Sequence, residues 1–385
     1  MHYTRCSANW RTAEALDAEL LNGAVLILHP NAKSELATLF NQMKVSRSLY
    51  EAASGIRLSL VPCLFAMLAA ATGCAWRTDT RPVCSAPPQR YTLVPLPLLP
   101  SAINDHRQIT GITEGHRAAI WSEGSGLREI PIPSGFASSA GIGINNRGHV
   151  LLMAYDRTFS RHQAFTFSTG RLAQLTGMQT RGFQLNDRDE VVGEAAETGS
   201  GKTNPVYWSN GDLHRIDTCC GGSAKDIDRQ GHVIGDMYDV DGHYFAFRWS
   251  VEDGTQRLGP ADRFSSALAV NAQGHALIEM AREVYFYGGA GLVKLSLAKK
   301  FPSHPRAINE CDVFVGAYGP FSDKYRAFIW DASAGFGDLN DRLVSAAGWK
   351  LKSADGINAR GEIVGKGTLA NDEDRGYLLI PVSGK

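Results

Sequence analysis

The densest group of carboxylates in the sequence lies in DMYDVDGHY, a stretch that starts at Asp236. Calcium-binding loops place oxygen ligands at alternate positions, and Asp239 and Asp241 occupy two such positions. The distal glutamate of these loops is missing, so the stretch favours a solvated turn, with calcium at Asp239 and Asp241 as the alternative. The acidic run NDEDR from Asn371 is interpreted in the same way. The sequence therefore predicts no cofactor.

Two other motifs suggest a phosphate site and a disulfide. GSGKT at residues 199–203 is similar to part of a phosphate-binding loop, but the first Gly of that motif would fall on Ala196. We interpret this segment as a loop between two strands. The adjacent cysteines Cys219 and Cys220 allow a vicinal disulfide, or pairing with Cys84 or Cys311, in an oxidising compartment. The sequence leaves these alternatives open.

The elements that position these residues follow from an internal repeat, whose clearest copy is ADGINARGEIVG from Ala354 to Gly365. An aliphatic residue precedes an Asn or Asp, a polar turn follows, and a short apolar run ends, in most copies, in Gly. The spacing between copies is 38 to 49 residues, which is typical of propellers and solenoids. The seven anchor positions are Asn104, Asn145, Asn186, Asp228, Asn271, Asn309 and Asn358.

Each repeat has the pattern of four short antiparallel strands. The aliphatic residue before the anchor ends a first strand that faces a core, the anchor starts a turn, and a second strand follows. A third strand ends in an aromatic residue in six of the seven units, as at Phe167 and Trp208, which predicts a large buried side chain between sheets. A turn and a fourth strand complete a unit of the size of one propeller blade.

The two ends of the repeat region are predicted to share one sheet. The last unit ends at its third strand, and YTLVPLP at residues 91–97 has the pattern of a spare fourth strand. Pairing of these segments would leave no free edge. The sequence therefore predicts an all-β fold, a seven-bladed β-propeller of four-stranded antiparallel blades at residues 89–385. A linear solenoid of the same units is the alternative.

The segment before the repeats has the layout of a secretory signal at residues 43–74, with basic residues followed by an apolar run that ends in small residues. Cys74 lies where bacterial lipoproteins carry their lipidated cysteine, so we expect an outer-membrane lipoprotein of the bacterial cell envelope, or a secreted protein. Residues 75–88 would form a tether, and residues 1–42 an upstream extension from a misplaced start. An uncleaved membrane anchor is the alternative, because about 20 apolar residues span a bilayer.

Taken together, the repeated hairpin and the third strand resemble the HAF-repeat family, named for a His-Ala-Phe run that is present here as HQAF from His162 and YFAF from Tyr244. The resemblance covers about residues 89–385. The resemblance implies a secreted or cell-surface bacterial β-propeller. It implies no particular reaction.

The function predicted from these features is a binding or scaffolding module, a monomer that recognises a glycan or an envelope protein. Equal numbers of basic and acidic residues, 39 each, argue against a nucleic-acid partner. Loops on a rigid scaffold usually carry binding residues. The loops that join second to third strands would share one face of a propeller. The candidate ligand-face residues in them are Tyr155, Arg157, Lys202, Asp239, Asp241, Tyr318 and Lys324.

The alternative function is a propeller enzyme, a lyase or hydrolase acting on an extracellular polysaccharide. Such an enzyme needs acid and base groups that converge near the axis. First-strand positions here are mostly small or apolar, which favours the binding module. The polar exceptions are Gln184, Lys225, Asp226, Arg306 and Asp355.

Overall fold

The computed structural model describes residues 88–177, 179–196, 202–216, 221–289, 291–298, 301–369 and 373–382. The chain separates into two units, Met1–Thr80 and Arg81–Lys385, and all described residues belong to the second. The predicted extension, signal segment with Cys74 and most of the tether lie outside the described residues, as do Cys219 and Cys220. Within the described part, no helix is long and apolar enough to span a membrane.

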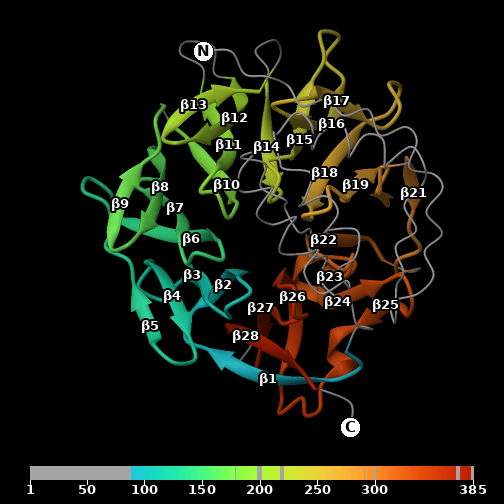
Figure 1. The fold of residues 1–385 in the computed structure, drawn as a ribbon. Coiled ribbons are helices and arrows are strands. Elements are labelled where there is room, and N and C mark those ends of the chain that lie inside the picture. The colour runs from blue at the N-terminus through green and yellow to red at the C-terminus, as the bar shows by residue number, and fades with distance from the viewer. Residues whose placement is uncertain are drawn as a thin grey trace, which may run out of the picture. The chain divides into compact units, whose positions relative to one another are not determined.

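Seven four-stranded antiparallel sheets surround a common centre (Figure 1), which confirms the predicted seven-bladed β-propeller. Short 3-10 turns, η1 (Ser322–Lys324) and η2 (Leu339–Arg342), are the described helical elements. The first three sheets are β2 (Leu99–Ile103), β3 (Ile109–Ile112), β4 (Ala118–Ser122) and β5 (Gly126–Glu129); β6 (Ser138–Ile144), β7 (Val150–Tyr155), β8 (His162–Ser168) and β9 (Arg171–Gln174); and β10 (Arg181–Leu185), β11 (Val191–Ala196), β12 (Thr203–Ser209) and β13 (Asp212–Arg215). The next three are β14 (Gly222–Ile227), β15 (Val233–Tyr238), β16 (Tyr244–Ser250) and β17 (Gly254–Leu258); β18 (Ser265–Val270), β19 (Ala276–Met280), β20 (Glu283–Tyr287) and β21 (Leu292–Lys294); and β22 (Ser303–Ile308), β23 (Phe314–Tyr318), β24 (Arg326–Asp331) and β25 (Gly335–Asp338).

The seventh sheet combines strands from both ends of the propeller. Its order is β1 (Tyr91–Leu96), β28 (Asp374–Pro381), β27 (Ile363–Thr368) and β26 (Lys350–Ile357). Strand β1 pairs antiparallel with β28 from Tyr91 opposite Pro381 to Leu96 opposite Gly376. Figure 1 shows β1 along the outer edge of β28. The side chain of Tyr91 is completely buried, so this strand contributes to the core as well as to the sheet.

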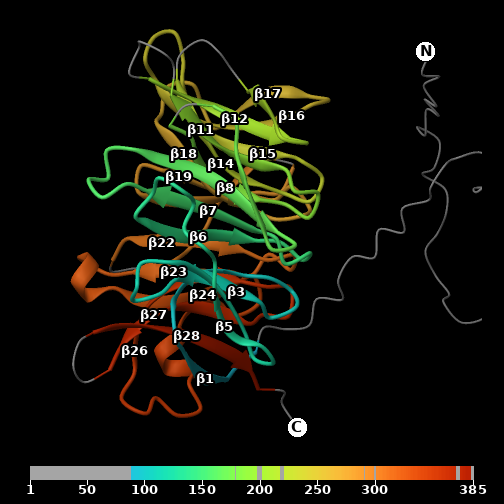
Figure 2. The same cartoon turned by 90° about the vertical axis from the view of Figure 1, so that its left-hand side faces the viewer.

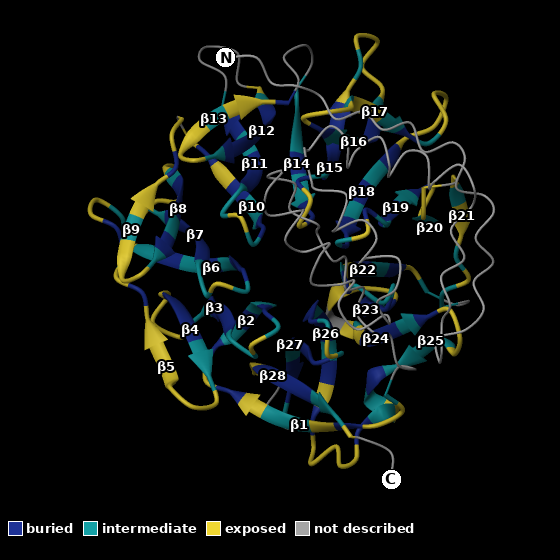
Figure 3. Ribbon diagram, in the orientation of Figure 1, coloured by how far each residue is buried: buried dark blue, intermediate teal, exposed yellow. Residues whose placement is uncertain are grey.

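The hydrophobic core is divided into seven clusters, one at each boundary between neighbouring sheets. Between the second and third sheets, for example, Leu151 packs in one cluster with Val191 and Trp208. Trp208 is the last residue but one of β12 and is 1% exposed, as its aromatic position predicted. Burial decreases from the inner strands to the outer strands β5, β9 and β13 (Figure 3).

The alternation of strand direction creates two different faces. Turns from first to second strands, which contain the anchor residues, lie on one face, which we call the anchor face. Connections from second to third strands, and from each sheet to the next, lie on the opposite face, which we call the loop face. Figure 2 shows the blades from the side, with the loop between β7 and β8 and the turn η1 projecting on the same side.

Candidate binding face and central channel

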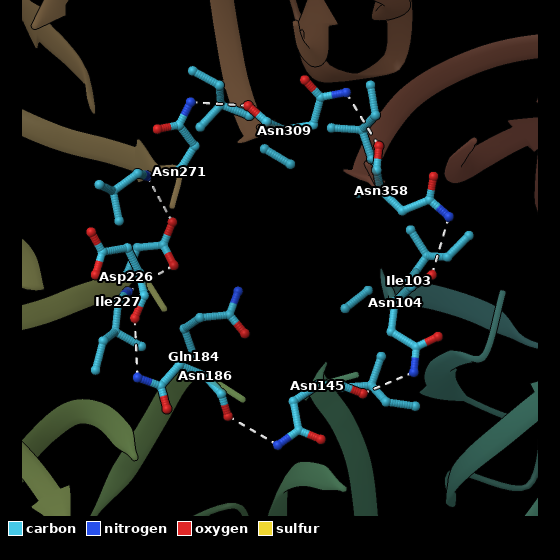
Figure 4. A pocket seen from close by; sticks show the side chains of 18 of the residues that line it. Ile103, Asn104, Asn145, Gln184, Asn186, Asp226, Ile227, Asn271, Asn309 and Asn358 are labelled. Carbon is cyan, nitrogen blue, oxygen red and sulfur yellow. Dashed lines mark hydrogen bonds between the residues drawn. The ribbon is translucent and has the colours of Figure 1, made fainter. Parts of the chain in front are cut away.

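The anchor residues form a nearly continuous hydrogen-bonded ring around the centre of the propeller (Figure 4). In six of them the side-chain amide Nδ2 donates to the main-chain oxygen of the next anchor. Each bond therefore ties one sheet to its neighbour at the innermost point of the blade. The six bonds run from Asn104 to Asn145 (2.8 Å), Asn145 to Asn186 (2.9 Å), Asn186 to Asp228 (3.0 Å), Asn271 to Asn309 (3.0 Å), Asn309 to Asn358 (3.2 Å) and Asn358 to Asn104 (3.1 Å).

The same side chains also stabilise their own turns. The Oδ1 atom of Asn145 accepts from the main-chain N–H of Arg147 (3.1 Å) and of His149 (3.0 Å), and the other anchors repeat this arrangement. The residue three positions after the anchor has a positive φ, for example 74° at Gly148, which explains why Gly recurs there. Asn145 also donates from Nδ2 to Oδ1 of Asp189 (2.8 Å), and its side chain is 4% exposed, so these bonds have little access to water.

The ring is interrupted at Asp228, because a carboxylate cannot donate a hydrogen bond. Its Oδ2 atom lies 2.7 Å from Nδ1 of His232 instead of donating to the next blade. Asp226 makes the missing connection between these sheets from two residues upstream. Its Oδ2 atom accepts from the main-chain N–H of Val270 (2.9 Å) in the neighbouring sheet, while Oδ1 accepts from Ile227 (2.9 Å).

Burial raises the pKa of Asp226 to about 7, against the opposing effect of the two amide N–H groups that it accepts. The folded protein therefore keeps this proton at pH values where the unfolded chain loses it. Stability from this group is fully present below the unfolded pKa near 4 and is lost as the pH rises to about 7.

We expect the free energy of unfolding to fall between pH 5 and pH 7, and Asp226→Asn to remove up to about 1.4 kcal/mol per pH unit of that slope. Urea titrations of the wild type and the variant at three pH values measure this pH dependence of the free energy of unfolding. The matched control is Asp253→Asn, which changes a half-exposed carboxyl in a blade turn. Parallel slopes for wild type and Asp226→Asn would contradict this assignment.

Arg229, the residue after the interrupted anchor, bridges the anchor-face end of the channel. Its guanidinium lies 2.7 Å from a carboxylate oxygen of Asp105, 3.2 Å from Asp187 and 3.4 Å from Glu310. These partners come from the first, third and sixth sheets. The side chain therefore spans the axis and links blades that are distant around the ring.

Charged residues on the rest of the anchor face pair with one another. Arg107 forms an ion pair with Glu362 across the junction of the first and seventh sheets. Arg147 lies 2.7 Å from Asp189 across the junction of the second and third. The charges that this face presents are therefore largely matched within the protein.

Seven β-bulges at one register shape the opposite part of the channel. In each first strand the pairing shifts around the residue three positions before the anchor, as between Gly182 and Gln184. Each of these bulged residues lines the central cavity, which has a volume of about 350 Å³. They are Ser101, Ile142, Phe183, Lys225, Leu268, Arg306 and Asp355.

Asp236 differs from the solvated turn that the sequence predicted for it. It lies in β15, is completely buried, and accepts hydrogen bonds from Tyr244 Oη (2.5 Å) and the main-chain N–H of Ala267 (2.7 Å). Lys225 forms an ion pair with it and donates to Ser266 Oγ (2.9 Å). The prediction was wrong because a carboxylate with this many donors is stable inside the sheet.

Two of the predicted loop residues, Lys202 and Asp239, line one hollow of about 820 Å³ between the third and fourth sheets. Tyr238 and Tyr244, whose ring centroids are 5.0 Å apart, line the same hollow. Asp241 follows in the adjacent turn and is exposed. The hollow therefore combines aromatic, acidic and basic groups on the loop face.

The remaining predicted residues lie in two other blades. Tyr155 ends β7, and Arg157 is exposed in the loop that follows. Tyr318 ends β23, where its hydroxyl donates to Asp338 (2.6 Å), and burial raises its pKa to about 12. Lys324 ends the turn η1 on the same blade. The structure therefore spreads the seven residues over four blades.

The acidic turn contains one more possible ligand than the sequence indicated. Side-chain atoms of Asp239, Asp241 and His243 lie within 4.8 Å of one another. Oδ1 of Asp239 already accepts from the main-chain N–H of Asp241 (3.1 Å) and His243 (2.8 Å), and Oδ2 lies 3.2 Å from Arg257. The geometry is that of a hydrogen-bonded turn, so it carries no metal assignment here.

Large apolar side chains are exposed at several positions of the loop face. Phe159 is 69% exposed in the loop after β7, and Phe321 is 67% exposed in the loop after β23. Val240 occupies the equivalent loop of the fourth blade, and Phe264 (68% exposed) the connection to the fifth. On the anchor face, the described residues in the turns from first to second strands include no exposed large apolar side chain, and Val251 (72% exposed) lies in the turn from β16 to β17.

Sequence reasoning identified the anchors as turn residues but missed their bonds between blades, the seven bulged positions as a set, and Arg229. A signal existed for Arg229, because several residues that directly follow an anchor are charged or polar, among them Asp105, Asp187 and Glu310. The bulges leave no such signal. Phe183 and Arg306 both lie three positions before an anchor, but one side chain is aromatic and the other is charged.

Known structures of similar fold are distant in sequence. The β-propeller domain of the Trilobed protease from Pyrococcus furiosus matches 75% of this chain and 95% of its own, with a TM-score of 0.50 and 10% identity. Puromycin hydrolase matches 81% of this chain and 56% of its own (TM-score 0.51, 14% identity), and virginiamycin B lyase from Staphylococcus aureus matches 75% and 99% (0.49, 9%). No model of a protein family and no curated protein matches the sequence. At these identities the likeness supports the fold alone.

Proposed function

We propose that this β-propeller is a non-enzymatic binding module of the bacterial cell envelope that docks a partner protein on its loop face. The observation that carries the proposal is the unequal distribution of exposed phenylalanine side chains. Phe159, Phe264 and Phe321 lie in exposed connections of the loop face, each at least two-thirds exposed. Exposed aromatic side chains at the ends of loops are costly to hydrate and favour an interface.

Charges near these side chains favour a protein over a membrane or a nucleic acid. Phe159 lies between Arg157 and Arg161, but Asp156 belongs to the same loop, and Phe264 follows Asp262 and Arg263. These residues are three basic and two acidic, a net charge too small for a strong attraction to phosphate groups. Aromatic and arginine side chains are the types that most often dominate the binding energy of protein interfaces.

The proposal is tested by substituting Phe159 and Phe321 with Ser in the full-length protein. We expect at least a tenfold loss of the partners recovered from cross-linked cell envelopes, because a central aromatic contact is worth about 2 kcal/mol or more. Quantitative mass spectrometry of the captured proteins measures the loss. Arg147→Ser on the anchor face serves as the control. Equal recovery with the double variant and the wild type would overturn the proposal.

Location in the envelope rests on the predicted signal at residues 43–74. If Cys74 is the lipidated first residue, the propeller follows a short tether on the outside of a membrane. The intact mass of protein purified from membranes should then correspond to a diacylglyceryl-modified chain that begins at Cys74. A mature chain that retains residues 1–42 would contradict this part of the proposal.

A hydrolase or lyase is the second candidate, because Asp226 faces the channel with a pKa of about 7, a value suited to general acid–base catalysis. Its two oxygens, however, accept main-chain N–H groups, and Asp355 is bonded to Arg306 (2.5 Å) and Ser353 (3.0 Å). These bonds give both carboxylates structural roles. Turnover of a polysaccharide that is lost in Asp226→Asn and Asp355→Asn would favour the enzyme.

A further inference from the structure

The central channel has the form of a pocket with one restricted end. At the anchor face, Arg229 and its three carboxylate partners extend across the axis inside the ring of asparagines. At the opposite end the bulged residues surround the opening. A ligand would therefore enter from the loop face and meet the bulged residues first.

Polar groups in the wall offer both donors and acceptors of hydrogen bonds. Arg306 is 43% exposed and uses one nitrogen on Asp355, so its other N–H groups are available to a ligand. The Oε1 atom of Gln184 accepts from the main-chain N–H of Leu185 (3.0 Å), and its amide nitrogen bonds to Asp226, which leaves its second N–H for a ligand. Figure 4 shows the amide extending into the channel. Lys225 is different, because Asp236, Ser266 and Ala267 already accept from it.

Apolar groups complete the same wall. Phe183, Ile142 and Leu268 line the cavity at the bulged positions of the other sheets. A ligand that has hydroxyl groups on its edges and C–H groups on its faces matches a wall that is polar on one part and aromatic or aliphatic on another. This combination is the surface chemistry of a sugar ring.

The charge of the wall excludes several other ligands. Six acidic and three basic residues line the cavity, so its field repels carboxylates and phosphates. The three basic side chains already have carboxylate partners in the protein. The available donors on Arg306 and Gln184 would have no function toward a simple cation. These features favour a neutral ligand.

We propose that the channel binds a neutral saccharide of one or two rings, which enters from the loop face. A cavity of about 350 Å³ lies at the lower end of the range for small-molecule sites and suits a ligand of this size. The proposed pocket is independent of the partner-docking loops, since Phe159 and Phe321 do not line it. It would give the module a second, small-molecule specificity.

Isothermal titration of the full-length protein with maltose, cellobiose and di-N-acetylchitobiose tests this proposal, with a uronic acid disaccharide and putrescine as charged probes. We expect one of the neutral disaccharides to bind and both charged probes to fail. Arg306→Ala should weaken that binding at least tenfold, and Arg282→Ala, an exposed arginine outside the cavity, should leave it unchanged.

Gln184→Ala provides a second variant that leaves the Arg306–Asp355 ion pair intact, and it should also weaken binding. No binding of any neutral probe at millimolar concentration, preferential binding of a charged probe, or unchanged affinity in Gln184→Ala would each overturn the proposal. Phe159→Ser with Phe321→Ser should retain saccharide binding, so failure of the pocket and failure of the docking face give different results.

Discussion

Replacing Asn145 with Ala should reduce the free energy of unfolding by about 2–4 kcal/mol, because the change removes four hydrogen bonds made by one buried side chain. The main-chain oxygen of Asn186 and Oδ1 of Asp189 lose their donor, and the N–H groups of Arg147 and His149 lose their acceptor. Urea denaturation of the wild type and the variant measures the difference.

The interrupted position in the ring supplies a matched control. Asp228→Asn keeps the size of the side chain and adds a donor that can reach the next anchor, while His232 can change tautomer to accept from the new amide. We expect its stability to differ from the wild type by less than about 1 kcal/mol. If Asn145→Ala costs no more than Asp228→Asn, the ring bonds do not stabilise the propeller.

The fold could be predicted because residues close together in the sequence specify each unit of the repeat. An aliphatic residue, an Asn, a turn and a second apolar run specify a hairpin in each copy, as in INARGEIVG from Ile357. The aromatic end of the third strand, as at Trp208, indicates packing against a neighbouring sheet. Seven such units near 40 residues apart then limit the architecture to a ring or a solenoid.

The channel could be predicted only in part, because its geometry depends on register between strands and on contacts between distant blades. Gln184 and Arg306 stood out as polar residues in first strands, but nothing local showed that the bulges at Phe183 and Arg306 place these positions in the channel wall. Arg229 meets Asp105 and Glu310, which lie 124 and 81 positions away in the sequence. Asp236 was placed in a turn because its burial depends on donors from the next sheet.

The second large effect is expected from removing the outermost strand of the seventh sheet. Strand β1 pairs along its length with β28, and Tyr91 and Leu96 are 0% and 8% exposed. Its loss would expose the edge of β28 and open the core between the sixth and seventh sheets, in which Tyr91 packs. We expect a chain that begins at Leu98 to lose cooperative unfolding or to aggregate.

This experiment has a control and a rescue. A chain that begins at Pro88 retains β1 and should unfold like the full-length propeller. A synthetic peptide of residues 88–97, added to the chain that begins at Leu98, should restore cooperative unfolding because the strand can pair without a covalent link. A scrambled peptide of the same composition should not.

The most direct test of the ring is the thermal unfolding curve of the chain that begins at Leu98, recorded with and without the 88–97 peptide. The closed ring predicts a broad or absent transition alone and a sharp transition with the peptide. An equally sharp transition at the wild-type temperature without the peptide would show that β1 does not complete the last sheet.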